Sequence, residues 1–166
     1  MLERLAEAEA ALPALLLDTT GWRSLDIDYH PPRVQRLHRP WRGLRLSLHR
    51  IWPCAPDAAL FRPHPWPSAM KVVCGAYQMA VGYGSGTTPP PVMATMLLRA
   101  GSCYAMTDPD AWHAVRPLGG PSLSVMLTGA PWQRAAPVVP SRPLRPLSEA
   151  DVAGLLAEFR AAFPLG

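Results

Sequence analysis

The chain has 166 residues and a net charge of +4, and its 49% hydrophobic content is enough to bury the core of one domain. Its 21 prolines argue against a bundle of long helices, because proline breaks or caps a helix. No run of 18 apolar residues occurs, which argues against a membrane-spanning helix, and acids near the N-terminus are unlike a secretory leader.

The first third of the chain contains one clear helical pattern. Leu2 to Leu17 is amphipathic, with acids at its start where the helix dipole favours them, and Pro13 would kink it or begin a second piece. We expect an irregular connection from Thr19 to His30. The next arginines recur every third residue among prolines, which favours polyproline geometry up to about Trp41. These arginines are Arg33, Arg36, Arg39, Arg42 and Arg45.

Short β-rich runs follow. Leu44 to Ile51 alternates strictly, so its leucines share one face of a strand and Arg45, Ser47 and His49 share the other. Four similar runs, separated by glycine and proline turns, predict an antiparallel sandwich or barrel. These runs are 70–75, 77–83, 93–99 and 122–128. Ser148 would cap a last helix running to about Phe163, reached through a proline-rich tether at 137–146.

The charge is unevenly distributed. Between Tyr29 and Thr107 there are nine basic residues and one acid, Asp57, which leaves +8 on that segment. Such a segment attracts an anionic partner, or it forms a solvated rim that pairs with the acidic first 28 residues. Nucleic acid is disfavoured, because Trp41 is the one aromatic residue among the bases from Arg33 to Arg50.

Three cysteines, Cys54, Cys74 and Cys103, are scattered along the chain. Their odd number and their spacing predict neither a disulfide framework nor a zinc site. We therefore expect a reduced protein in the cytoplasm.

Two segments together carry a resemblance to a known family. The first is Phe61-Arg62-Pro63-His64-Pro65-Trp66-Pro67-Ser68, followed by a glycine turn at Gly75. The second begins at Gly101, continues through Asp110-Ala111-Trp112-His113 and ends near Gly129. They resemble the two-motif signature of the cupins, small jelly-roll barrels that include the cysteine dioxygenase-like enzymes. The resemblance covers about 44–129.

This resemblance implies a fold and a metal site. The fold would be all-β, a cupin-like double-stranded β-helix with a helix at each end. It would form one domain over 1–166, with an N-terminal helical segment at 1–30, the barrel core at 44–129 and the tether and last helix at 137–166. His64 and His113 would hold a divalent iron, nickel, manganese or copper, and Gln78 or His49 would complete the shell. Many cupins are homodimers, so the resemblance also implies a second copy.

The sequence departs from the family pattern at three positions. Arg62 stands where the family has the first histidine, Ser68 where many members have a carboxylate, and Gln78 where relatives have a glutamate. Arginine cannot deprotonate to bind a metal, whereas its guanidinium matches a carboxylate or a phosphate. His49 is a further nitrogen ligand if its strand face lines the barrel, and a surface residue otherwise. We expect His30 and His38 to be solvated.

Two functions follow from these residues. The first is a metal-dependent oxygenase or isomerase whose anionic small-molecule substrate pairs with Arg62, in a pocket that Tyr77, Tyr104 and Trp112 help to line. The alternative is a metal-free cupin that acts as a ligand-binding or regulatory module. Both predict that His64 and His113, 49 positions apart in sequence, meet at one cavity that Arg62 also faces.

Overall fold

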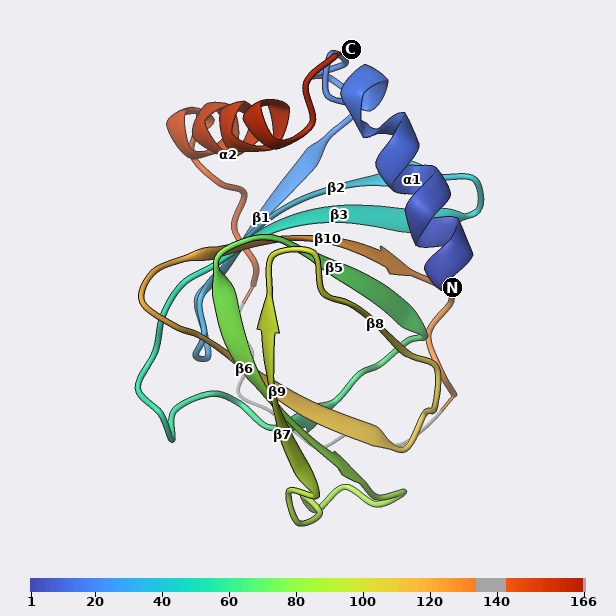
Figure 1. Ribbon diagram of the computed structural model, residues 1–166, viewed down its shortest axis with the longest axis vertical. Coiled ribbons are helices and arrows are strands. Elements are labelled where there is room, and N and C mark those ends of the chain that lie inside the picture. The colour runs from blue at the N-terminus through green and yellow to red at the C-terminus, as the bar shows by residue number, and fades with distance from the viewer. Residues whose placement is uncertain (134–142, 166) are drawn as a thin grey trace.

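The computed structural model describes residues 1–133 and 143–165, which form two helices and ten strands (Figure 1). Their bounds, in chain order, are α1 Leu2–Leu15, β1 Arg23–Ile27, β2 Val34–Trp41, β3 Leu44–Ile51, β4 Arg62–Pro63, β5 Ser68–Cys74, β6 Ala76–Tyr83, β7 Ala94–Arg99, β8 Cys103–Met106, β9 Ala111–Pro117, β10 Ser122–Thr128 and α2 Glu149–Ala162.

The strands form two antiparallel sheets. The larger has the order β1-β2-β3-β10-β5-β8, and the smaller has the order β4-β9-β6-β7. Both helices lie over the outer face of the larger sheet, and the smaller sheet lies on its other side (Figure 1). The protein is thus mostly β, as expected, but the strand order is that of two open sheets and the jelly-roll barrel is not confirmed.

The main hydrophobic core lies between the helices and the larger sheet. Leu5 and Leu12 of α1 and Phe159 of α2 pack there against Leu46 and Leu48 of β3. The leucine face of the alternating strand is therefore turned toward the helices. The opposite face of β3 looks into the space between the sheets, where Ser47 and His49 are also buried.

The space between the sheets has a smaller core and a polar region. The apolar part gathers three methionines and two further side chains, Met70, Val72, Tyr77, Met79 and Met126. The polar part lies along the inner face of β2 and β3, where the register pairs Arg36 with His49 and His38 with Ser47. This polar interior positions the candidate site.

Several predicted elements are confirmed and two are wrong. Leu44–Ile51 and Ser122–Thr128 are strands with the expected bounds, and Ser148 caps α2 by accepting a hydrogen bond from the Asp151 N–H. The irregular connection at 19–30 contains strand β1, and the stretch expected as polyproline is strand β2. Pairing with β3 over eight residues gives β2 the ladder hydrogen bonds that polyproline geometry lacks.

Two further expectations concern the ends and the membrane. α1 continues through Pro13, which lies inside the helix. Residues 137–142 of the expected proline-rich tether lie outside the described residues. Neither helix in the described part of the chain has the length and hydrophobicity needed to cross a membrane.

Candidate functional site

A small basic cavity, called here the inner cavity, lies between the two sheets. Its volume is about 60 Å³. Its polar lining consists of six side chains, four histidines and two arginines: His30, Arg36, His49, Arg62, His64 and His113. The apolar lining includes Met70 and Met126 from the larger sheet. No residue with a carboxylate lines the cavity among those that the structure describes.

Strand pairing brings the smaller sheet's residues together. Arg62 of β4 is paired with His113 of β9, so their side chains point to the same face, and His64 follows two residues after Arg62. The ring centroids of His64 and His113 lie 4.9 Å apart at an interplanar angle of 83°. Both histidines are buried, with exposed fractions of 8% and 7%. The two motif histidines and Arg62 therefore meet at one cavity.

The larger sheet supplies the opposite wall. Arg36 of β2 and His49 of β3 are directly opposed in register, and Arg36 Nε donates a hydrogen bond to His49 Nε2 over 2.8 Å. His49 is 2% exposed, so it lies between the two sheets. Of the two positions that the sequence left open for His49, the structure has the interior one.

The hydrogen bonds fix which ring nitrogens are free. The carbonyl of Trp66 lies 3.0 Å from His64 Nδ1 and can only accept, so Nδ1 carries the proton and Nε2 has the lone pair. The carbonyl of Pro31 fixes His30 in the same way. Buried His30 Nε2 and His113 Nδ1 have no hydrogen-bond partner within the described part of the protein. Unpaired buried polar atoms of this kind are costly unless a ligand or water satisfies them.

The two arginines of the inner cavity lack a carboxylate partner in the described chain. Arg36 contacts His49, and Arg62 lies beside Tyr29. Four other arginines of the basic segment do form ion pairs, which fits the expected pairing with the acidic N-terminal residues. These pairs are Arg33–Asp26, Arg39–Asp18, Arg42–Glu7 and Arg50–Glu158, the last with a carboxylate of α2.

Burial and the neighbouring positive charges lower the pKa values of the side chains that line the inner cavity. Burial, followed by neighbouring arginines, lowers the pKa of His64 to about 4. The pKa values of His49 and His113 lie well below the usual value for the same first cause. Burial also lowers the pKa of Arg36 to about 10. At neutral pH the imidazoles are therefore neutral and both guanidiniums keep their charge.

Four other predicted site residues do not line the inner cavity. Gln78 lies on the other face of the smaller sheet, where Arg116 Nη2 donates to its Oε1 over 2.9 Å. Trp112 is fully buried against Phe61, and its indole N–H donates to the Gly84 carbonyl.

Tyr77 and Tyr104 form a hydrogen-bonded pair at 3.1 Å beside the Met70 sulfur. Burial raises the pKa of Tyr104 to about 12, so its phenol stays protonated. Neither tyrosine reaches the histidines through a contact in the described structure, and the pair belongs with the apolar core between the sheets.

The residues present do not fit a divalent metal. The described chain contains no group of three histidine, cysteine, aspartate or glutamate side chains placed to hold one ion. Of the ligands that the resemblance implies, two imidazoles remain, His64 and His113, because Arg36 occupies His49 Nε2 and Gln78 faces away. Arg62 also places a fixed positive charge beside them, which opposes a second cation. The N–H donors and positive charges of Arg36 and Arg62 suit an anion instead.

Sequence reasoning missed two cavity residues, Arg36 and His30. His30 was expected to be solvated, and Arg36 was assigned to a polyproline run. The signal was available in β2, where Val34, Arg36, His38 and Pro40 alternate with Gln35, Leu37 and Arg39. The arginines alone recur with a period of three, and this pattern favoured polyproline geometry over the period of two that is typical of a strand.

Comparison with known proteins gives structural neighbours only. No protein-family model and no curated protein sequence matches this chain. Among solved structures, hydroxypropylphosphonic acid epoxidase from S. wedmorenis aligns over 64% of this chain and 55% of that one, at 20% identity and a TM-score of 0.49. Streptomyces albus HEPD with 2-hydroxyethylphosphonate and Fe(II) bound aligns over 59% and 21%, at 14% identity and a TM-score of 0.45. The chain spans about half the length of the epoxidase, and these scores are too low to assign a function.

Proposed function

We propose that this chain is a small-molecule binding protein that holds the acid group of an anionic ligand in the inner cavity. The observation that supports this proposal is the lining of the inner cavity, which contains two guanidiniums and four imidazoles. No carboxylate occurs among the described lining residues. A buried positive charge without a partner is strongly unfavourable, and an entering anion removes that penalty.

The lining also defines the shape of the ligand group. Arg36 and Arg62 donate to its oxygens from opposite sheets, and a guanidinium can bind carboxylate or phosphonate oxygens with two donors. The lone pairs of His30 Nε2 and His64 Nε2 accept from a hydroxyl or a protonated oxygen. A volume of about 60 Å³ accommodates an acid group rather than a whole large molecule.

Binding of small anions tests this proposal directly. Acetate and methylphosphonate are titrated by calorimetry against the wild-type protein, Arg62→Gln and the control Arg145→Gln, which changes an exposed arginine outside the cavity. Loss of a charged hydrogen bond predicts affinity at least about tenfold weaker in Arg62→Gln and unchanged in the control. Equal affinities in all three proteins, or no binding at all, would reject the proposal.

A metal-dependent oxygenase is the second candidate, because the ring centroids of His64 and His113 lie 4.9 Å apart. Elemental analysis of protein purified without added metal distinguishes the two functions. We expect less than about 0.1 equivalent of iron, nickel, manganese or copper, with no gain on reconstitution. Near-stoichiometric metal that disappears in His64→Ala and His113→Ala would establish the second candidate instead.

We also infer a homodimer, as the resemblance implies, joined along β7. This strand is an edge of the smaller sheet, and its neighbourhood exposes Met93, Met96 and Leu97. An exposed apolar edge strand offers both backbone hydrogen bonds and side chains to a second copy.

A further inference from the structure

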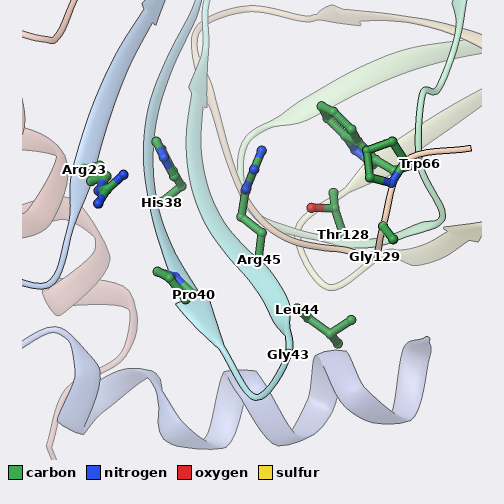
Figure 2. A pocket seen from close by; sticks show the side chains of 11 residues that line it. Arg23, His38, Pro40, Gly43, Leu44, Arg45, Trp66, Thr128 and Gly129 are labelled. Atoms are coloured by element: carbon green, nitrogen blue, oxygen red, sulfur yellow. The ribbon is translucent and has the colours of Figure 1, made fainter.

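A second cavity, called here the outer cleft, opens above the β2–β3 hairpin (Figure 2). Its volume is about 440 Å³, far larger than that of the inner cavity. It lies farther along the same inner face of β2 and β3. The register pairs Arg36 with His49 at the inner cavity, then His38 with Ser47, then Pro40 with Arg45 at the outer cleft.

The charged groups of the outer cleft are all basic. Arg23, His38 and Arg45 line it, and none of its described lining residues carries a carboxylate. Neither Arg23 nor Arg45 forms an ion pair within the described chain, whereas the nearby acids Asp18 and Asp26 are bound to other arginines. In Figure 2 the side chains of His38, Arg45 and Trp66 rise from three neighbouring segments toward the same space.

Two buried polar atoms of residues that line this cleft have no hydrogen-bond partner within the described residues. They are His38 Nδ1 and the indole nitrogen Nε1 of Trp66, and both residues line the cleft. Buried polar atoms without a partner are unfavourable, so their presence in one cleft points to a ligand that pairs with them. The Arg45 guanidinium stands 5.9 Å from the Trp66 ring centre, which places charge and aromatic surface together.

Apart from Thr128, the remaining side chains of the lining are apolar. Pro40, Leu44, Ala130 and Pro131 contribute carbon surface, and Trp66 adds an aromatic ring. A cleft of a few hundred Å³ with apolar walls and a few convergent polar groups is typical of a small-molecule site.

We infer that the outer cleft is a second binding site, for a small organic anion that joins a carboxylate or phosphate to an apolar body. The oxyanion pairs with Arg45 and accepts from the indole N–H of Trp66, and Arg23 adds positive charge on the far side of His38. The apolar body packs on Pro40, Leu44 and the Trp66 ring. The inner cavity is too small to hold such a molecule, so the two sites take different ligands.

Nuclear magnetic resonance of the indole N–H groups tests this inference. The chain has six tryptophans, and a Trp66→Phe variant assigns the Trp66 signal. The intact protein is titrated with phenyl phosphate, benzoate and inorganic phosphate. The same titrations are made on Arg45→Gln, on Arg62→Gln at the inner cavity, and on the control Arg145→Gln, an exposed residue that lines neither cavity.

We expect phenyl phosphate or benzoate to move the Trp66 signal saturably, and inorganic phosphate to bind more weakly because it lacks the apolar body. Affinity should fall at least about tenfold in Arg45→Gln and stay within about twofold in Arg62→Gln and Arg145→Gln. A shift that survives Arg45→Gln but disappears in Arg62→Gln would assign the binding to the inner cavity and overturn the inference. No saturable shift with any probe would overturn it as well.

Discussion

Acidification should destabilise this protein through its buried histidines, and His64 shows the effect most clearly. Its pKa falls from 6.5 to about 4 in the folded protein, first because of burial and then because of Arg62 and Arg36. The unfolded chain therefore binds the proton first. The contribution of His64 to the free energy of unfolding is fully present above pH 6.5 and is lost as the pH falls toward about 4.

The magnitude follows from the difference between the two pKa values. Each pKa unit corresponds to about 1.4 kcal/mol, so a difference of about 2.5 makes the full contribution of His64 about 3 kcal/mol. At pH 5 about 2 kcal/mol of this is lost. His64 is 8% exposed, so little solvent screening reduces the effect. His49 and His113 act in the same direction and add to it.

Urea unfolding of the wild-type protein and of His64→Gln at pH 7.5 and pH 5 measures this effect. Glutamine cannot take up the proton, and its amide can still donate to the Trp66 carbonyl. The wild-type protein should lose about 2 kcal/mol more than the variant over this range. The exposed carboxylates titrate equally in both proteins and cancel in the comparison. Equal losses in the two proteins would refute the assigned burial of His64.

Two further predictions concern packing and assembly. Replacing fully buried Phe159 with alanine removes the α2 side chain that packs on the larger sheet, and urea unfolding should show a loss of about 3–5 kcal/mol; a loss below about 1 kcal/mol would contradict the packing of α2 on this sheet. Light scattering should give a dimer mass for the wild-type protein and a monomer mass for Met96→Asp combined with Leu97→Asp on β7, whereas an unchanged dimer would place the interface elsewhere.

The sequence predicts five of the ten strands, β3, β5, β6, β7 and β10, because glycine or proline turns separate these short apolar runs. Leu44–Ile51 is the clearest example, since both its bounds and the separation of its two faces are confirmed. β1 and β2 were missed for a physical reason. Their pairing with each other and with β3 is long-range, and it overrides the local preference that the prolines and regularly spaced arginines express.

The candidate site was predictable only where the motif spacing placed it. The meeting of His64, His113 and Arg62 follows from the two-strand geometry that the resemblance implies. The opposite wall, Arg36 with His49, depends on which face of β2 and β3 turns inward. The alternation shows which residues share a face, but which face turns inward depends on how the helices cover the leucine face.

The identity of the residue at position 62 determines which kind of ligand this cavity suits. An imidazole there would add a lone pair for a cation and no fixed charge at neutral pH. A guanidinium adds a permanent positive charge and no lone pair, which repels a cation and attracts an oxyanion. Arg36 places a second such charge on the facing sheet, and no acid among the described lining residues offsets either one. Two charges on opposite walls define the position of an anion between them, so restoring a metal site would require more than changing Arg62 to histidine. Arg36 would still hold His49 and keep the cavity positive.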